Sequence, residues 1–439
     1  MTDELEPHQL TGGNFLAPRG FAIIADDPGL GKTATAIHGA DIAGARKILV
    51  LCPAVVREHW CLEFLRWQQI PRFVTVAEGH PKVIPGDGVT IVAHDALSHK
   101  PSMHLLACGF PYDLIIVDEL HVFRQFGASR TSALMDPESG MCRWTKQFWG
   151  LTGTPLVNSA ADIWPFFYGP LKGGVIWWDF CQRYTEIKTG FDGPTPTGVK
   201  NAAELAGFLR PYVLRRTSES VGLELPPLYI ENEAVPVAPE TMISVMADLE
   251  AWSPQRLMAA LDMQDELRDS ALARVRRTLG IAKVRPTADH VHNLIDRGCG
   301  PVVVFFQHTD MRKMLFDALH HQFGYKVSWI DGKITRAQLK AAQSWFQAGR
   351  IDVLLVQTQA GGMGLTLTQA NRTVVAEMPW TAVGLWQAIK RVHRITQTRA
   401  VTAEILRGEG CWLEDILASV VGKKQRASNE LLNLLVSNE

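Results

Sequence analysis

The feature that most constrains the fold is a glycine-containing loop between an apolar run and a helix-forming stretch. Residues Phe21–Ala25 are apolar, Asp26–Thr33 read D-D-P-G-L-G-K-T, and the alanine-rich residues from Ala34 onward favour a helix. Strand, loop and helix in this order build a cradle for nucleotide phosphates, because the loop amides and the helix N-terminus point at the ligand. An ordinary glycine turn is the alternative, since the strict phosphate-loop pattern has Gly where this chain has Asp26.

Four residues of the loop have defined tasks if it binds a nucleotide. Gly29 and Gly31 would let the backbone curl so that successive N–H groups point inward. Lys32 would reach the β- and γ-phosphates, and the Thr33 hydroxyl would ligate Mg²⁺. The loop therefore predicts a site for a nucleoside triphosphate with magnesium.

Composition indicates an ordinary globular protein with room for more than one core. The 439 residues are 46% hydrophobic and 20% charged, which suits two or three domains' worth of buried side chains. No apolar run approaches the ~20 residues needed to cross a bilayer, and the acidic N-terminus Met1–Glu6 is unlike a signal peptide. We therefore expect an intracellular protein with no membrane partner, cytoplasmic and DNA-associated if its source is not eukaryotic.

Cysteine spacing and net charge exclude further classes. The seven cysteines include no C-x-x-C pair, which argues against a zinc module and against a disulfide framework. The formal net charge of −1 gives no global attraction to nucleic acid, so any DNA binding must rest on local basic groups.

Short apolar runs alternate with amphipathic stretches, which is typical of parallel sheets covered by helices on both faces. The strands predicted from these runs are Phe21–Ala25, Lys47–Cys52, Val89–Ala93, Tyr112–Val117 and Phe148–Leu151, and then Pro301–Phe306, Lys326–Ile330, Ile351–Val356 and Arg372–Ala376. Residues Thr335–Phe346 and Thr381–Arg394 are predicted crossover helices. The predicted fold class is α/β.

The same pattern divides the chain into three parts. Residues 1–225 form the first α/β domain, with a helical elaboration from about residue 164, and Pro226-Pro227 marks its end. Residues 226–285 are predicted to be a helical linker or insertion. Residues 286–439 form the second α/β domain with closing helices.

Two acids follow a predicted strand on the same side of the first sheet as the loop. Asp118 and Glu119 come directly after the apolar run Leu114–Val117, and open α/β sheets bind ligands at the carboxyl ends of their strands. Asp118 would hold the magnesium, and Glu119 would orient or deprotonate an attacking water. A polar strand end facing solvent is the alternative.

Other motifs fit a site of this kind but are weaker alone. Thr152-Gly153-Thr154 follows a short strand and could sense the occupant of the cleft, or be a simple turn. Gln387, Arg391 and Arg394 stand at i, i+4 and i+7 of a predicted helix, so one face would present two arginines to developing phosphate charge upon domain closure. A solvated basic face is the alternative. The glycine cluster within Gln359–Leu365 could lay amides against phosphate.

Taken in order, these motifs resemble the Swi/Snf-type ATPases of helicase superfamily two over nearly the whole chain. The residues that carry the resemblance are Leu5–Gln9, Asp26–Thr33, Leu51–Ala54, Asp118–His121, Leu151–Pro155 with Asn158, Leu214–Thr217 with Leu225–Pro227, Ile330–Gly332, Ala360–Leu365 and Gln387–Thr398. The segment around Arg215 and Arg216 is similar to a signature largely confined to Swi/Snf members.

The resemblance implies two RecA-like domains, ATP with Mg²⁺ as cofactors, and double-stranded DNA bound largely independently of sequence. It implies that Gln9 contacts adenine and that the ATP site comprises Asp27, Gly29, Leu30, Gly31, Lys32, Thr33 and Gly364. It assigns the metal to Thr33 and Asp118, and catalysis to Glu119, Gln387, Arg391 and Arg394. It assigns coupling and DNA tracking to Pro53, Thr152, Gly153, Thr154, Gly361 and Gly362.

The chain departs from the family pattern at Pro28, Leu120, Gln359 and Thr396, and none of these changes removes a group that hydrolysis requires. No histone-reading module is recognisable, so the expected activity is that of a minimal double-stranded DNA translocase. Two alternatives stay open. One is a helicase that separates or anneals strands of DNA or RNA, and the other is an ATP-gated DNA clamp that does not hydrolyse.

Overall fold

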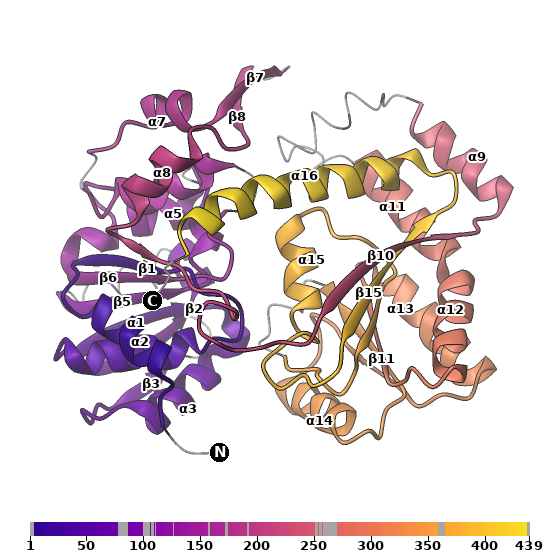
Figure 1. The fold of residues 1–439 in the computed structure, drawn as a ribbon, viewed down its shortest axis with the longest axis horizontal. Helices are drawn as coiled ribbons and strands as arrows, with labels where there is room; N and C mark the ends of the chain where they lie inside the picture. The colour runs from indigo at the N-terminus through magenta and orange to yellow at the C-terminus, as the bar shows by residue number, and fades with distance from the viewer. Residues whose placement is uncertain are drawn as a thin grey trace. The chain divides into compact units, whose positions relative to one another are not determined.

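The computed structural model describes residues 4–77, 87–99, 106, 109, 111–125, 127–156, 159–171, 174–190, 193–250, 253, 257, 270–358 and 365–436. The chain divides into two compact units (Figure 1), which we call unit 1 (Met1–Leu223 and Arg426–Glu439) and unit 2 (Glu224–Gln425). Each unit is built on one parallel sheet with helices on both faces, which confirms the predicted α/β class. Helix α16 (Trp412–Leu434) begins in unit 2 and ends in unit 1.

Unit 1 contains a seven-stranded sheet in the order β3-β4-β2-β5-β6-β1-β9, in which every pairing is parallel. Its strands are β1 (Phe21–Ile24), β2 (Lys47–Cys52), β3 (Val74–Val76), β4 (Gly88–Ala93), β5 (Tyr112–Asp118), β6 (Thr145–Leu151) and β9 (Val213–Leu214). The central strands read as continuous apolar runs because helices cover both of their faces.

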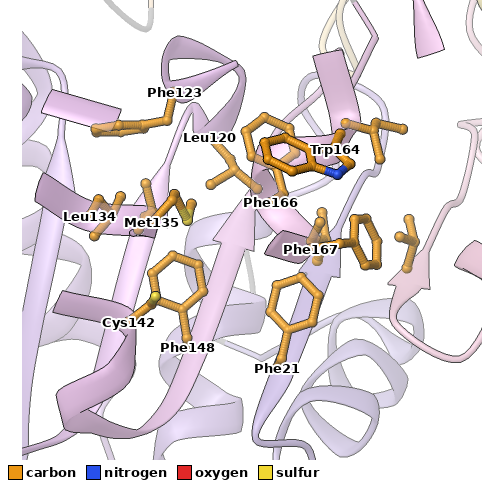
Figure 2. Close-up of a cluster of buried hydrophobic side chains, with 14 of the residues drawn as sticks. Phe21, Leu120, Phe123, Leu134, Met135, Cys142, Phe148, Trp164, Phe166 and Phe167 are labelled. Carbon is orange, nitrogen blue, oxygen red and sulfur yellow. The ribbon is translucent and has the colours of Figure 1, made fainter. Parts of the chain in front are cut away.

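The two faces of this sheet carry different helices. One face packs on α1 (Pro7–Leu16), α2 (Lys32–Ile42) and α3 (Arg57–Trp67). The other face packs on an aromatic cluster, shown in Figure 2, in which Phe21 and Phe148 from the strands meet Trp164 and Phe167. The elements on that side are α5 (Ser129–Met135), α6 (Trp164–Tyr168), α7 (Trp177–Tyr184), α8 (Ala202–Leu209) and the hairpin of β7 (Glu186–Gly190) with β8 (Gly193–Thr197).

The core of unit 1 also contains residues from the far end of the sequence. Leu431, Leu432 and Leu435, at and just after the end of α16, are buried in the same cluster as Phe21 and Phe148. Arg210 Nη2 donates a hydrogen bond to the carbonyl of Leu434 over 3.1 Å. Unit 1 is therefore assembled from two separate stretches of chain.

Unit 2 contains a six-stranded parallel sheet in the order β10-β15-β14-β11-β13-β12. Its strands are β10 (Leu228–Val235), β11 (Val302–Phe306), β12 (Val327–Ile330), β13 (Val353–Gln357), β14 (Arg372–Val375) and β15 (Val401–Gly408). Its helices are α9 (Pro239–Asp248), α11 (Ser270–Ala282), α12 (Val284–Asp296), α13 (Thr309–Phe316), α14 (Arg336–Gln347), α15 (Ala382–Ile389) and the first part of α16. Helices α12 and α13 cover one face, while α9, α11, α14 and α15 contribute to the cluster on the other.

The predicted strands are found close to their expected bounds, whereas three other features differ from prediction. The edge strands β3, β9 and β10 and the inner strand β15 were not predicted. The predicted helical linker also contains β10, whose side chains are mostly exposed and whose middle reads Glu231-Asn232-Glu233, so that it lacks the continuous apolar run of a buried strand. Among the described residues, no helix is both long and apolar enough to cross a membrane.

The third difference concerns the helix predicted over Thr381–Arg394, which ends at Ile389. The buried Gln397 side chain donates hydrogen bonds to the carbonyls of Thr368, Ala370 and Val392 over 2.7 to 3.2 Å. The Arg391 carbonyl accepts from Leu367 N over 2.9 Å. These bonds occupy carbonyls that a longer helix would use, so the chain turns instead. The prediction that Gln387, Arg391 and Arg394 share one helix face is therefore wrong, although all three lie in unit 2.

Candidate nucleotide site

The predicted strand, loop and helix are present in unit 1. β1 ends at Ile24, α2 begins at Lys32, and the loop between them contains two glycines with positive φ, Gly29 at 100° and Gly31 at 76°. Side chains disfavour this backbone conformation, so the loop shape depends on glycine. A Cβ on Gly31 would also lie 2.1 Å from Gln9 Nε2. The structure therefore supports a phosphate cradle rather than an ordinary turn.

Lys32 points back along the loop. Its Nζ donates hydrogen bonds to the carbonyls of Asp26 over 2.8 Å and Asp27 over 3.2 Å. Burial lowers the pKa of Lys32, while the nearby charges of Glu119, Asp26 and Asp118 oppose that shift. The ammonium therefore lies close to both predicted acids, where an incoming triphosphate would replace the carbonyls as its partner.

Asp118 stands at the carboxyl end of β5 and is held through both oxygens. Oδ1 accepts from the backbone N–H of Glu119, and Oδ2 accepts from Trp60 Nε1, each over 2.9 Å. Burial, reinforced by the charge of Glu119, raises the pKa of Asp118. Trp60, on α3, is fully buried and was not predicted to belong to the site.

The oxygens near the loop fit a magnesium ion. Among the described residues, no group of three or more His, Cys, Asp or Glu could hold a metal by itself. Mg²⁺ commonly takes one or two protein oxygens and completes its shell with phosphates and water. Each Asp118 oxygen keeps an acceptor site after its one hydrogen bond, and Thr33 is the second residue of α2, beside the loop.

Glu119 has the strained backbone often found at functional residues. Its φ of 49° and ψ of 51° lie in the left-handed region, which is uncommon for a residue other than glycine. Glu119 Oε2 lies 3.3 Å from His121 Nδ1. Burial lowers the pKa of His121 to about 3, so this imidazole is neutral at physiological pH. His121 therefore places no positive charge beside the Glu119 carboxylate.

The turn after β6 contacts His121 and packs on the loop. Thr152 Oγ1 is 3.2 Å from His121 Nδ1 and accepts from Thr154 N over 3.1 Å. A Cβ on Gly153 would lie 3.0 Å from Pro28 Cγ, so this turn packs on the loop at a position where the chain departs from the family pattern. The turn therefore contacts both the phosphate loop and the histidine beside Glu119.

A second departure, Leu120, is explained by packing. Leu120 is fully buried, and its Cδ2 lies 2.4 Å from the position that a Cβ on Gly150 would occupy. The absence of a side chain on β6 at Gly150 leaves the space that the larger residue fills. The change thus affects the core and not the reacting groups.

Helix α1 approaches the loop from its other side. His8 Nε2 is 2.9 Å from the carbonyl of Leu30, and Gln9 Nε2 donates to the same carbonyl over 3.4 Å. The Gln9 Oε1 atom accepts from Glu6 N over 3.0 Å. Pro53 follows β2, the neighbour of β5, and so lies at the same edge of the sheet.

The predicted site residues thus fall into three groups. Unit 1 brings together Gln9, Asp27, Gly29, Leu30, Gly31, Lys32, Thr33, Pro53, Asp118, Glu119, Thr152, Gly153 and Thr154. Unit 2 contains Gln387, on α15, the buried Arg391, and Arg394, whose Nη1 donates to Thr366 Oγ1 over 3.0 Å. Gly361, Gly362 and Gly364, with Gln359 and Asn158, lie outside the described residues.

Two RecA-like sheets, the first with a phosphate loop and paired acids, define a helicase-type nucleotide-binding protein. The family model described as the SNF2-related domain matches residues 8–242, more than half of the chain, and the helicase conserved C-terminal domain matches residues 287–396. The chain belongs to the SNF2-related family, as its motifs predicted. Members of this family use nucleotides.

Similar proteins include two curated relatives and one solved structure. The chain is 26% identical to the mouse DNA annealing helicase and endonuclease ZRANB3, over 98% of this chain and 41% of that protein. It is 29% identical to the Xenopus tropicalis SWI/SNF-related matrix-associated actin-dependent regulator of chromatin subfamily A-like protein 1, over 96% of this chain and 44% of that protein. The chain thus spans less than half the length of these relatives. The Sulfolobus solfataricus SWI2/SNF2 ATPase core in complex with dsDNA has 21% identity and a TM-score of 0.45, over 99% of this chain and 97% of that one.

Proposed function

We propose that this chain is a DNA-stimulated ATP hydrolase that translocates along double-stranded DNA, as a DNA-associated protein inside the cell. The observation that carries the proposal is the convergence of the glycine loop, Lys32, Asp118 and Glu119 at one edge of the sheet in unit 1. This set can bind Mg·ATP and position water, but it offers no arginine of the kind that stabilises a phosphoryl-transfer transition state.

The missing positive charge would come from unit 2. Arg391 and Arg394 follow α15 in unit 2, and a hydrolysis step that needs them would proceed only when both units close on the nucleotide. If each unit grips the same DNA backbone, cycles of closure and opening would move the protein along the duplex. DNA held by its phosphates would be bound with little sequence preference and with strong salt dependence.

Each residue then has a stated role in the proposed mechanism. Gln9 contacts adenine, Lys32 the phosphates, and Thr33 with Asp118 the magnesium. Glu119 orients and deprotonates the attacking water, and its strained backbone is consistent with a fixed orientation. Magnesium, when bound, would neutralise phosphate charge. The turn Thr152–Thr154 would couple this chemistry to the DNA.

The tests are phosphate release and nucleotide binding. We expect ATP turnover to rise when duplex DNA is added, and to rise more with duplex than with single-stranded DNA or RNA. Arg394→Ala should bind ATP with near-normal affinity and lose ~10³-fold in DNA-stimulated turnover. DNA-stimulated turnover near the normal rate in this variant would remove Arg394 from the site. If the unaltered protein does not hydrolyse ATP, the alternative of an ATP-gated DNA clamp would be favoured.

Strand annealing is a second candidate function. A relative that matches 98% of this chain is called a DNA annealing helicase. Annealing predicts that forked DNA, or duplex with single-stranded gaps, stimulates turnover more than fully paired duplex does. Reannealing of a melted fork, followed by gel shift with hydrolysable and non-hydrolysable nucleotide, would distinguish annealing from translocation alone.

A further inference from the structure

Two adjacent arginines of unit 1 lie beside the phosphate loop, although sequence reasoning gave them no part in the site. They follow β9, the edge strand that pairs in parallel with β1. The pairing continues beyond β1 into the loop, because Ala25 N donates to Leu214 O over 2.8 Å and Asp27 N donates to Arg216 O over 3.0 Å. Ala25 and Asp27 are thus hydrogen-bonded to the segment that carries Arg215 and Arg216.

Arg216 binds the carboxylate of Asp26. Its Nη2 donates to Oδ2 over 2.6 Å, its Nε to Oδ1 over 3.2 Å, and its backbone N–H to Oδ1 over 3.0 Å. Both side chains are at most 1% exposed. Arg216 also donates to the carbonyl of His8 on α1. The carboxylate at the position where the strict loop pattern has Gly is therefore turned into the protein.

Arg215 binds the next carboxylate in the same way. Its Nη2 donates to Asp27 Oδ1 over 2.6 Å, and its Nη1 donates to the carbonyl of Ala25. The other carboxylate oxygen, Oδ2, accepts from Ser218 N over 3.4 Å. The backbone of Arg215 pairs in turn with Val436, just beyond α16. This pair is more exposed than the first, with side-chain exposures of 10% and 20%, so it is the better one to alter.

We propose that Arg215 and Arg216 are positioning residues of the nucleotide site, which hold Asp26 and Asp27 away from the incoming phosphates and compensate their charge. Two uncompensated carboxylates at the start of the loop would repel a triphosphate. The same arginines fix the two residues whose carbonyls hold Lys32, so the lysine stays aligned with the cradle. The inference rests on the proposed nucleotide site and gives the Leu214–Thr217 signature a physical role.

The test measures the Kd of a fluorescent ATP analogue with Mg²⁺ and without DNA, in the full chain. Arg215→Gln should raise Kd by about 10- to 100-fold, as loss of a positioning partner does at other sites, because Asp27 becomes free to face the phosphates. Asp27→Asn alone should raise Kd by less than Arg215→Gln does. The double variant that combines Arg215→Gln with Asp27→Asn should recover most of the lost affinity, since it no longer has the negative charge of Asp27.

Three outcomes would overturn the inference. Arg215→Gln could bind the analogue within twofold of the unaltered protein. The double variant could show no recovery, which would mean that Arg215 contacts the phosphates itself. Asp27→Asn alone could lose as much affinity as Arg215→Gln, which would make the carboxylate a ligand. If the unaltered protein binds no nucleotide, the proposed function fails rather than this inference.

A matched ion pair controls for stability. Arg72 Nη1 contacts Asp41 Oδ1 over 2.6 Å with side-chain exposures of 1% and 5%, and Asp41 lies toward the opposite end of α2 from Lys32. Arg72→Gln should lower the Tm at least as much as Arg215→Gln and leave the Kd unchanged. An equal rise in Kd for Arg72→Gln would show that any lost ion pair in unit 1 weakens binding, and would contradict a specific positioning role.

Discussion

Unit 1 and unit 2 each hold a carboxylate where a parallel strand ends, but the two carboxylates have different surroundings. Asp118, at the end of β5, accepts one hydrogen bond at each oxygen. Glu377, just after β14, accepts from Gln307 N over 2.7 Å, from His308 N over 2.9 Å and from His308 Nδ1 over 2.6 Å. Three donors, one of them an imidazole, therefore surround the acid of unit 2.

This difference moves the two pKa values in opposite directions. Burial and the neighbouring Glu119 charge raise the pKa of Asp118. Burial also acts to raise the pKa of Glu377, but the hydrogen bonds and charge of His308 outweigh it and the net shift is downward. A carboxylate that is fully bonded stabilises its fold, whereas one that is buried with spare acceptor sites is suited to a ligand. The same strand-end position thus holds a fully bonded carboxylate in unit 2 and one with spare acceptor sites in unit 1.

The largest effect should come from the second acid of unit 1. Glu119→Gln keeps the shape of the side chain but cannot accept a proton from water, so DNA-stimulated turnover should fall ~10³-fold, within the range for loss of a general base. Single-turnover phosphate release would measure it, alongside nucleotide Kd, which should change little. Turnover within tenfold of normal would show that unit 1 has no base at this position.

A smaller and different effect should follow the same substitution in unit 2. Glu377→Gln removes the charge that three donors share and should destabilise unit 2 by about 2–3 kcal/mol, because hydrogen bonds to charged groups are the stronger ones. Hydrogen exchange in β11 and β14 would measure the stability of unit 2 separately from that of unit 1. Glu231→Gln, on the exposed strand β10, is the control. Unchanged protection after Glu377→Gln would contradict the comparison.

Acid should reproduce part of this loss. Glu377 and Glu404 both have lowered pKa values. Burial opposes this shift, but hydrogen bonds from His308 lower the pKa of Glu377, and those from His290 lower the pKa of Glu404. Their stabilising contribution is therefore complete above the unfolded pKa, near 4.3, and is lost as the pH falls through the folded values. Protection factors for hydrogen exchange in unit 2 should fall below about pH 4.3, and less steeply in Glu377→Gln. An equally steep change in that variant would exclude Glu377 as a source.

The smallest effect should have the opposite sign. Asp118→Asn removes a buried charge while its amide oxygen can still accept from Trp60, so unit 1 should gain about 0.5–1 kcal/mol, as active-site residues often cost stability. Magnesium-dependent nucleotide binding should be lost at the same time. Thermal unfolding, monitored by hydrogen exchange in β5, would measure the gain in stability of unit 1. A destabilised unit 1 would mean that Asp118 is a structural acid like Glu377.

Much of this arrangement could be predicted because its signals are local. A parallel strand buried on both faces is a continuous apolar run, and the loop is defined by glycines whose positive φ values few other residues adopt. Asp118 and Glu119 are recognisable because they follow such a run directly. The order of the motifs along the chain indicated the family, which no single motif could do.

The features that could not be predicted depend on contacts between distant residues. β10 is an exposed edge strand whose pairing with β15 leaves no apolar pattern. The end of α15 is set by the side chain of Gln397, which takes carbonyls that the helix would otherwise use. Trp60 lies 58 residues before its partner Asp118. Only the polar atom of the indole distinguishes this residue from a core aromatic, and the sequence does not show where that atom points.

The two-piece construction of unit 1 has a consequence for synthesis of the protein. Leu431, Leu432 and Leu435 close a core whose other members are all encoded before Leu223. On a ribosome the first unit to be started is therefore the last to be completed, after all of unit 2 has been made. At ~5–20 residues per second, the apolar surface that these leucines cover stays exposed for on the order of tens of seconds. A chaperone would bind the unfinished protein most readily during that interval.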